Sequence, residues 1–332
     1  MFNDKTVMIT GGTGSFGKKF TEILLKKYKP KKVIIYSRDE FKQFEMSKVF
    51  NNSCMRYFIG DVRDKDRLLR AMEGVDYVVH AAALKHVPVA EYNPMEAIKT
   101  NILGANNVID AALEVGVRKV VALSTDKAVN PINLYGATKL AADKLFIAAN
   151  NIKGSRDIKF SVVRYGNVMA SRGSVIPLFI KLTEEGRKKL PITHPDMTRF
   201  WVTLEGAVNF VIMAFGTMQG GEIFVPKIPS MKITDLAKAI NPDAEFEIIG
   251  IRPGEKLHET LISVDESYHT IEFKKYFIIQ PSIYFTGRPE YLVNAWGETG
   301  KRKDYGFRYS SDNNDRWLTV EDLREKLRDF SV

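Results

Sequence analysis

The sequence predicts an α/β protein built around a parallel, doubly wound sheet, and three observations lead to this prediction. Short β-branched apolar runs alternate with amphipathic segments through the first half of the chain. A glycine-rich turn follows the first apolar run, and polar residues follow the ends of the later runs. Such alternation is typical of a sheet covered by helices on both faces. Ligands of these sheets bind beyond the carboxyl ends of the strands, where the polar residues would gather.

The apolar patterns place the elements of this first half in order. They predict strands near residues 5–10, 32–36, 56–60, 76–81, 118–123 and 159–165. They predict helices near residues 15–28, 39–48, 64–72, 92–115 and 134–150. After about residue 167 prolines and glycines become frequent and the alternation loosens. We therefore expect a first domain over residues 1–170 and a smaller α/β substrate-binding lobe over 171–332, with a later segment, about 196–226, returning to the first domain.

The turn after the first strand is a dinucleotide-binding fingerprint, VMITGGTGSFG over residues 7–17. It satisfies Gly-x-Gly-x-x-Gly from Gly12 and Gly-x-x-Gly-x-x-Gly from Gly11, between an apolar run and a helical pattern. Glycines let the backbone approach a pyrophosphate, and N–H groups of the helix N-terminus receive its charge. We expect a Rossmann-type domain whose cofactor contacts include Gly11, Thr13, Gly14, Ser15, Phe16 and Gly17. The alternative is a glycine-rich turn in an ordinary α/β protein.

The end of the second strand bears on the choice between the two nicotinamide cofactors. An NAD-preferring site usually has a carboxylate here, which binds the ribose 2′-hydroxyl. This chain has Ser37 and Arg38, a hydroxyl and a guanidinium that suit a 2′-phosphate and so favour NADP. Asp39 follows one residue later, which keeps NAD as the alternative, and Glu40 completes the expected cofactor segment.

Asp61 ends the third strand, beside Val62, and both are expected to contact the cofactor. The Asp61 carboxylate could meet the adenine amino group. Its alternative and compatible role is to cap the helix that begins near Arg63.

Tyr135 and Lys139 stand four residues apart, about one helical turn, so the phenol and the ammonium share a face of the helix. A nearby ammonium stabilises phenolate, which would help Tyr135 to act as a base near neutral pH. This spacing is common among surface pairs, but here the segment Ser124–Lys127 and an apolar run precede it. Within that segment, Asp126 and Lys127 add a carboxylate and an amine at a strand end. The alternative is that this pair is an exposed charged turn.

Composition argues against several other classes of protein. The net charge is +9, from 49 Lys and Arg against 40 Asp and Glu, but the basic residues are spread out and we see no nucleic-acid-binding module. Five histidines and one cysteine offer no metal-ligand spacing, so we expect no metal. No apolar run approaches the ~20 residues of a membrane span, and the first strand leaves no room for a signal peptide. We expect a cytoplasmic protein without membrane contact.

The fingerprint and the segment Ser124–Lys139 resemble the extended short-chain dehydrogenase/reductase family, which includes nucleotide-sugar epimerases and dehydratases. Other segments narrow the resemblance to the UDP-N-acetylglucosamine 4,6-dehydratases of the polysaccharide-biosynthesis branch, namely residues 81–88, 91–94, 99–101, 164–168 and 252–256. Within that branch, the Asp126–Lys127 pair and the lack of a membrane-anchored amino-terminal region resemble the C5-inverting enzymes. Those enzymes begin pseudaminic acid synthesis for surface or flagellin glycosylation. The match covers nearly the whole chain and is weakest towards its C-terminus.

The resemblance implies a dehydration in which a tightly bound NADP is regenerated in each turnover. Hydride leaves sugar C4 and later returns to C6, Tyr135 takes the C4 hydroxyl proton, and Lys139 holds the nicotinamide ribose and lowers the tyrosine pKa. Asp126 would act as the acid at the departing C6 hydroxyl and Lys127 as the base at C5. Lys127 must be neutral for this role, and burial with nearby positive charge would lower its pKa.

The resemblance also implies further contacts with both ligands. Beyond the segments above, the expected cofactor contacts are Ala81, Lys85, Tyr135, Lys139 and Val168. The expected contacts to the UDP-sugar are Lys85, Thr100, Asn101, Thr125, Lys127, Asn167, Gly173, Ser174, Val175, Thr193, Arg199, Arg252 and Glu255. Arginines suit the diphosphate oxygens, and Glu255 suits a ribose or sugar hydroxyl.

Two other functions stay open on the sequence alone. Another nucleotide-sugar enzyme on the same scaffold, a 4-epimerase or a C5-retaining 4,6-dehydratase, is the first. A 4-epimerase needs Tyr135 and Lys139 but not the Asp126–Lys127 pair. A non-catalytic NADP-binding regulatory protein is the second, and it has no need of the tyrosine base. The resemblance further implies a homo-oligomer that pairs through the 92–115 and 134–150 helices, at least a dimer, with a hexamer as the larger alternative.

Overall fold

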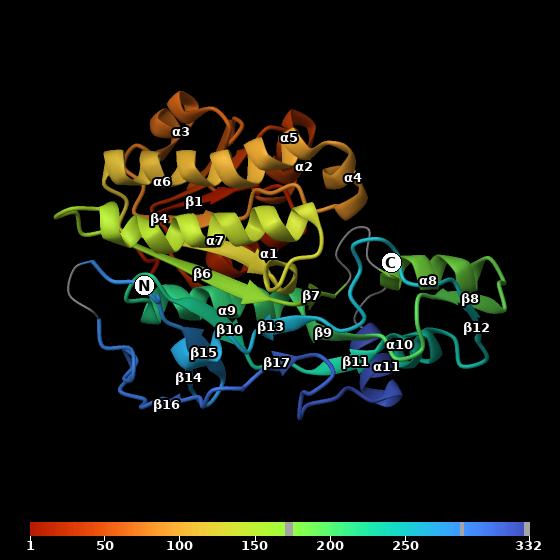
Figure 1. Ribbon diagram of the computed structural model, residues 1–332. Coiled ribbons are helices and arrows are strands. Elements are labelled where there is room, and N and C mark those ends of the chain that lie inside the picture. The colour runs from red at the N-terminus through yellow and green to blue at the C-terminus, as the bar shows by residue number, and fades with distance from the viewer. Residues whose placement is uncertain (170–174, 286–288, 329–332) are drawn as a thin grey trace.

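The structure is a computed structural model, which describes residues 1–169, 175–285 and 289–328. Within that part of the chain the largest sheet has ten strands in the order β16-β14-β15-β10-β6-β5-β4-β1-β2-β3 (Figure 1). From β10 to β3 neighbouring strands are parallel: β10 (Ile223–Pro226), β6 (Lys159–Tyr165), β5 (Lys119–Thr125), β4 (Tyr77–His80), β1 (Thr6–Thr10), β2 (Lys32–Ser37) and β3 (Met55–Ile59). The predicted α/β fold with a doubly wound parallel sheet is confirmed.

Later segments of the chain extend the same sheet. The strands β15 (Tyr276–Ile279), β14 (Thr270–Glu272) and β16 (Lys301–Arg302) add antiparallel neighbours beyond β10. The division of the chain into domains at residue 170 stays a prediction.

Helices cover both faces of this sheet. α3 (Lys65–Met72), α6 (Gly104–Val115) and α7 (Leu134–Ile152) pack side by side on one face (Figure 1). α1 (Ser15–Lys27) and α9 (Leu204–Thr217) pack together on the other face. Their apolar sides bury against the strands, which contribute fully buried runs such as the whole of β1. Among the described residues, we find no helix both long and apolar enough to cross a membrane.

Several helices have a polar N-cap residue, whose side chain accepts a hydrogen bond from a backbone N–H group of the first turn. The caps are Asp39 for α2 (Glu40–Val49), Asp64 for α3, Asn133 for α7 and Thr203 for α9. The capping alternative for Asp61 is therefore wrong, because α3 begins at Lys65 with Asp64 before it. Asp61 instead accepts hydrogen bonds from the backbone and guanidinium of Arg63, at 2.8–3.0 Å.

The single helix predicted over residues 92–115 is wrong, because the segment is broken. It forms α4 (Val87–Tyr92), α5 (Pro94–Ile98), a π-helical turn (Lys99–Leu103) and α6. The break falls at Asn93, whose φ of −121° and ψ of 64° lie outside the helical region. A residue before proline is sterically disfavoured in that region, so Pro94 explains the break. The π-helical turn then carries Thr100 and Asn101.

Shorter elements lie outside the main sheet; some of them pack against its core, and the others build a second core. Three small sheets join β7 (Asn167–Val168), β9 (Thr198–Val202) and β11 (Ser230–Lys232), then β8 (Lys189–Ile192) with β12 (Glu245–Ile248), then β13 (Thr260–Ile262) with β17 (Tyr309–Ser310). The helices of this part are α8 (Val175–Glu184), α10 (Ile233–Ile240) and α11 (Val320–Arg328), with a short 3-10 turn at Ser267–His269. Phe179, Leu236 and Leu323 lie fully buried in this second core. It packs beside the main sheet near the ends of β5 and β6.

Candidate active site

The glycine-rich turn brings three backbone segments into close contact. Gly11 has a φ of +65°, and a Cβ atom there would lie 2.8 Å from the backbone of Ala82, next to Ala81. A Cβ atom on Gly17 would lie 2.3 Å from the Gly12 carbonyl oxygen. Both positions therefore require glycine. A cradle of bare backbone before a helix N-terminus fits a pyrophosphate, which is the feature the fingerprint predicts.

The end of β2 lies against the same turn. The Thr13 hydroxyl is 2.9 Å from the Ser37 hydroxyl, which ties the turn to the strand end. The Arg38 side chain is 57% exposed, and its guanidinium lies 3.8 Å from the Asp61 carboxylate. The Asp39 carboxylate caps α2 and pairs with Lys42 at 2.6 Å. A solvent-facing guanidinium and an occupied carboxylate favour an anionic ligand at this strand end.

The Asp126–Lys127 pair lies on a short 3-10 turn (Asp126–Ala128) at the end of β5. Thr125 Oγ1 donates to Asp126 Oδ1 at 2.8 Å, and Lys127 Nζ donates to the same oxygen at 3.1 Å. Asp126 is completely buried, so the alternative of an exposed charged turn is wrong. Its other oxygen, Oδ2, has no hydrogen-bond partner among the described residues. An unsatisfied buried carboxylate oxygen is costly, so a ligand hydroxyl at this atom would be stabilising.

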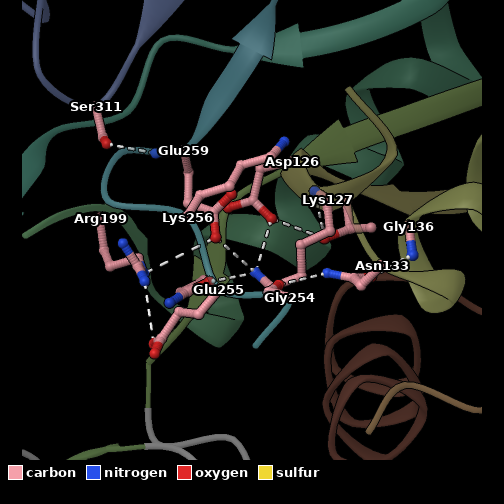
Figure 2. Close-up of polar contacts among 12 residues, drawn as sticks. Asp126, Lys127, Asn133, Gly136, Arg199, Gly254, Glu255, Lys256, Glu259 and Ser311 are labelled. Atoms are coloured by element: carbon pink, nitrogen blue, oxygen red, sulfur yellow. Dashed lines mark hydrogen bonds and ion pairs between the residues drawn. The ribbon is translucent and has the colours of Figure 1, made fainter. Parts of the chain in front are cut away.

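The first turn of α7 rests on this pair. A Cβ atom on Gly136 would lie 2.1 Å from the Lys127 carbonyl oxygen, so only glycine allows the helix to approach. The Asn133 side chain accepts from Gly136 N–H at 2.8 Å and donates to the Gly254 carbonyl at 2.8 Å (Figure 2). Lys256 in the same loop donates to the Val129 carbonyl at 2.5 Å. The loop of residues 252–256 is thereby attached to the start of α7.

Lys127 lies between two carboxylates. Its Nζ is 3.1 Å from Asp126 Oδ1 and 3.3 Å from Glu259 Oε1, with Asn167 Oδ1 at 3.4 Å (Figure 2). Burial lowers the pKa of Lys127, but the two carboxylates outweigh burial and raise that pKa above its ordinary value. The expectation that its surroundings lower the pKa is therefore wrong. The two carboxylates therefore favour the ammonium form of Lys127.

Tyr135 and Lys139 lie one turn apart on α7, as predicted. Burial raises the pKa of Tyr135 to about 12, and the Lys127 ammonium and a hydrogen bond with Thr125 oppose that rise. The cation that most lowers the pKa of the phenol is thus Lys127, not Lys139 as expected. Lys139 Nζ donates to the Leu123 carbonyl at 2.6 Å, and burial lowers its pKa.

A buried ionic network behind α7 received no role from the sequence. Arg164 is 1% exposed and lies 3.6 Å from the Asp143 carboxylate and 2.9 Å from that of Glu266. Ser124 Oγ donates to Asp143 at 2.7 Å. Asp143 follows Lys139 by one helical turn, and that spacing is a signal in the sequence. This network holds α7 against β5 and β6 through charges that are paired inside the protein.

The expected substrate contacts fall into two groups. Arg199 is buried in β9, where its guanidinium pairs with Glu255 at 3.2 Å and lies 3.9 Å from Glu259. Asn167, Thr193 and Val175 belong to the neighbouring elements β7, β8 and α8 or their ends, and the expected cofactor contact Val168 follows Asn167 in β7. Arg252 is exposed at the start of the loop that carries Glu255. Gly173 and Ser174 lie outside the described residues.

The second group surrounds the loop after β4. Asn101 accepts from Leu84 N–H at 2.8 Å and donates to the Leu84 carbonyl and to Thr138 Oγ1, both at 2.9 Å. Its amide therefore fixes the loop of residues 81–86, which includes Lys85, against α7. The buried Thr100 hydroxyl has no hydrogen-bond partner among the described residues. The individual ligand contacts stay predictions.

Glu259 is the charged residue that the sequence reasoning missed altogether. It directly precedes β13 and lies 2% exposed between Lys127 and Arg199. The sequence signal was weak, because Glu259 lies three residues beyond the recognisable 252–256 segment. Its position becomes apparent only when the C-terminal part of the chain is folded onto the end of β5.

The fold, the glycine-rich turn and the Tyr135–Lys139 helix define an extended short-chain dehydrogenase/reductase. Residues 7–281 match the family model described as polysaccharide biosynthesis protein, and the chain belongs to this family. The resemblance drawn from the motifs is confirmed.

Named relatives narrow the comparison. A UDP-N-acetylglucosamine 4,6-dehydratase (inverting) of Campylobacter jejuni is 64% identical over 98% of each chain. A UDP-glucose 4-epimerase of Rickettsia massiliae is 45% identical over 98% of this chain and 96% of its own. The crystal structure of Pen from Bacillus thuringiensis is 42% identical, with a TM-score of 0.89 over 99% of this chain and 98% of that chain. The dTDP-glucose 4,6-dehydratase DesIV from Streptomyces venezuelae, solved with NAD and TYD bound, shares the fold at 23% identity and a TM-score of 0.69, over 76% and 86% of the two chains.

The contact between Gly136 and Lys127 gives a first prediction. Gly136→Ala places a methyl group 2.1 Å from the Lys127 carbonyl oxygen, so the first turn of α7 or the Lys127 peptide must move. We expect the free energy of unfolding to fall by about 1–3 kcal/mol, measured by denaturant titration. Gly216→Ala in α9 is the matched control, because its Cβ would lie 3.6 Å from Trp296. The control should be neutral or stabilising by up to about 1 kcal/mol. Equal effects of the two substitutions would contradict the proposed packing.

Proposed function

We propose that this chain is a UDP-N-acetylglucosamine 4,6-dehydratase that inverts the configuration at C5. The observation that carries the proposal is the buried Asp126–Lys127 pair beside Tyr135, which supplies an acid, a base and a hydroxyl-activating group in one place. The Campylobacter jejuni relative, at 64% identity over 98% of each chain, supports the choice of substrate and of stereochemistry. The product would be UDP-2-acetamido-2,6-dideoxy-β-L-arabino-hex-4-ulose, and we further propose that it enters pseudaminic acid synthesis.

The fingerprint turn fits a nicotinamide dinucleotide, because Gly11 and Gly17 leave no room for a side chain where the backbone must approach a pyrophosphate. DesIV, which shares the fold, was solved with NAD bound. When bound at this turn, a nicotinamide dinucleotide would supply the hydride chemistry that the reaction needs at sugar C4 and C6. We infer that the dinucleotide is NADP. The exposed Arg38 guanidinium at the end of β2 suits a 2′-phosphate, and the Asp39 carboxylate is already engaged in capping α2 and in pairing with Lys42.

Tyr135 removes the C4 hydroxyl proton as hydride leaves C4. The positive charge of Lys127 makes this step easier, because it lowers a pKa that burial has raised to about 12. The resulting 4-ketone acidifies the C5–H bond. Lys127 then takes the C5 proton, and Asp126 protonates the C6 hydroxyl as it departs as water.

The resting ion pair has the wrong protonation state for these last two roles. Lys127, the proposed base, carries a proton that it must lose. Asp126, the proposed acid, is a carboxylate that must gain one. One proton transfer over the 3.1 Å contact from Lys127 Nζ to Asp126 Oδ1 corrects both at once. The N–H bond breaks, an O–H bond forms, and the net charge of the pair stays zero. A neutral pair is also easier to keep in a buried site than two separate ions.

The competing function is a nucleotide-sugar 4-epimerase, which the 45% identical Rickettsia massiliae relative supports. Such an enzyme uses Tyr135 and Lys139 but has no need for a buried acid–base pair at C5 and C6. A non-catalytic NADP-binding protein has no need for the charges around Tyr135. The buried Asp126–Lys127 pair favours the dehydratase over both.

The reaction itself gives the second prediction. Incubation of the purified protein with UDP-N-acetylglucosamine in D₂O should give a 4-keto-6-deoxy product with deuterium at C5 and the L-arabino configuration, identified by NMR. Tyr135→Phe is the control and should form neither this product nor reduced-cofactor absorbance. A C4 epimer without solvent deuterium would identify an epimerase instead. Retained configuration at C5 would keep the dehydratase and exclude inversion, and no turnover of any UDP-sugar would favour the regulatory protein.

The choice of cofactor gives the third prediction. Arg38→Ala should weaken NADP binding about 10- to 100-fold, the scale of a lost charge-assisted contact, and should leave NAD binding nearly unchanged. Binding can be followed by calorimetry on cofactor-free protein. Arg63→Ala is the matched control, because Arg63 also pairs with Asp61 but lies beyond the strand end. It should affect the two cofactors alike. Equal losses for both cofactors in Arg38→Ala would show that Arg38 does not read the 2′-phosphate.

The fourth prediction concerns assembly. We propose a homo-oligomer that pairs through the α4–α7 side, because Tyr92, Met95 and Leu103 there are 87%, 55% and 52% exposed. Light scattering at micromolar protein should give at least twice the chain mass of 37.6 kDa. Leu103→Glu should shift the protein towards monomer, whereas Val49→Glu, on the exposed side of α2, should not. A clean wild-type monomer would refute the proposal.

A further inference from the structure

The backbone of Glu259 is held in place by the C-terminal part of the chain. Glu259 N–H donates to Ser311 Oγ at 2.9 Å, and Ser311 N–H donates to the Glu259 carbonyl at 2.8 Å (Figure 2). Ser311 also hydrogen-bonds to Thr198 at 2.7 Å. These contacts lie where β13 pairs with β17. The backbone at Glu259 is therefore fixed independently of anything its side chain touches.

The side chain of Glu259 reaches across to the end of β5. Its Oε1 lies 3.3 Å from Lys127 Nζ and 3.9 Å from Arg199 Nε, while the shortest Arg199–carboxylate contact, 3.2 Å, is with Glu255. Lys127 is thus the closer cation to Glu259, and Glu255 is the closer carboxylate to Arg199. The second oxygen, Glu259 Oε2, is buried with no hydrogen-bond partner among the described residues.

Two carboxylates from distant parts of the chain therefore enclose one ammonium. Asp126 belongs to the same turn as Lys127, whereas Glu259 comes from the other side of the site. A carboxylate that is 3% exposed is costly to bury unless a cation compensates it, so the contact with Lys127 is not incidental. A single anion would already neutralise the lysine. The second one biases both the position and the protonation of the amine.

We propose that Glu259 is a positioning residue that holds the Lys127 ammonium against Asp126 and sets the pH at which Lys127 loses its proton. The proposal deepens the function proposed above and rests on it for the role of Lys127 at C5. The protonation of Lys127 is nevertheless a property of the free protein. It can therefore be tested without turnover.

The expected direction follows from charge. Glu259 stabilises the charged form of Lys127, so removing its negative charge should make the amine lose its proton at lower pH. An opposite charge at this distance typically shifts a pKa by about 1–3 units. Glu259→Gln removes the charge and keeps the shape of the side chain. Glu259→Asp keeps the charge and withdraws it by one methylene group, so its shift should be smaller.

The decisive measurement is the reactivity of Lys127 towards acetic anhydride as a function of pH, read peptide by peptide by mass spectrometry on the full-length protein. Only the neutral amine reacts, so the midpoint reports the titration of Lys127. We expect the midpoint to fall by about 1–3 units in Glu259→Gln and by less in Glu259→Asp. Lys181, which is 73% exposed, is an internal control and should keep its midpoint. Glu255→Gln, which removes a carboxylate paired with Arg199, should leave the Lys127 midpoint nearly unchanged.

A second measurement connects this titration to the reaction. The rate of deuterium incorporation at C5 during turnover in D₂O should fall at high pH, where the Lys127–Asp126 pair loses the one proton that its members share, and the falling limb should begin at lower pH in Glu259→Gln. A structural role alone would lower the rate equally at every pH. Thermal unfolding shows whether the variants are folded, and Glu259→Asp provides the test if Glu259→Gln is not.

The outcomes separate the two proposals. An unchanged Lys127 midpoint in folded Glu259→Gln, or an equal shift in Glu255→Gln, would overturn the role of Glu259. If the midpoint falls but the wild type forms no 4-keto-6-deoxy product, Glu259 still sets the charge of Lys127 and the dehydratase assignment fails. If the midpoint and the falling limb both move to lower pH, both proposals are supported.

Discussion

The first turn of α7 rests on the peptide of Lys127, and the remainder of the candidate site depends on that contact. Helix α7 carries Tyr135 and Lys139, while the turn beneath it carries Asp126 and Lys127. Their relative positions are set by how closely a helix can approach a strand end, and Gly136 removes the atom that would prevent it. Because sterics between backbone atoms are far steeper than hydrogen bonding, this approach defines the geometry more tightly than any polar contact could.

Charge is then organised around this fixed backbone. Lys127 and Arg199 face Asp126, Glu255 and Glu259, and most of these groups are largely removed from water. In such surroundings charges interact strongly, and each group keeps its protonation state only while its neighbours are present. In the proposed mechanism the same cation serves two purposes, since Lys127 eases ionisation of Tyr135 and then acts as a base. A proton that moves between members of such a site leaves the total charge of the site unchanged.

The fold was largely accessible from the sequence, and the reasons are local. The strands of the first half are continuous β-branched runs, and the fingerprint turn demands glycine wherever it occurs. The break at Asn93 also has a local cause, Pro94. We did not predict it, because the apolar pattern continues across the break. Asp64 rather than Asp61 caps α3, because the Asp64 carboxylate is the one that reaches a free N–H group of the first turn. The sequence shows both carboxylates near the helix start but not which of them reaches that group.

The chemistry of the site was less accessible, because it depends on contacts between remote segments. The residue types at 126, 127, 135 and 139 could be named from spacing. The protonation of Lys127 could not, since it depends on a carboxylate 132 positions further along the chain. From the sequence we expected positive charge near Lys127, which would lower its pKa. In the folded chain two carboxylates lie beside it instead. The same limitation explains why Glu259 and the Arg164 network were assigned no role.

The pairing of Glu259 with Ser311 also has a consequence for the time course of biosynthesis. A ribosome makes the parallel strands, the fingerprint turn and α7 first, so the elements that carry Tyr135 and Lys139 exist well before residue 311 has been made. Until β17 can pair with β13, Ser311 does not fix the backbone of Glu259, and the carboxylate that already lies beside Lys127 is that of Asp126. A nascent chain could thus present a nucleotide-binding fold before its acid–base centre is complete. Pairing of β17 with β13 is the step that brings Glu259 into its place beside Lys127.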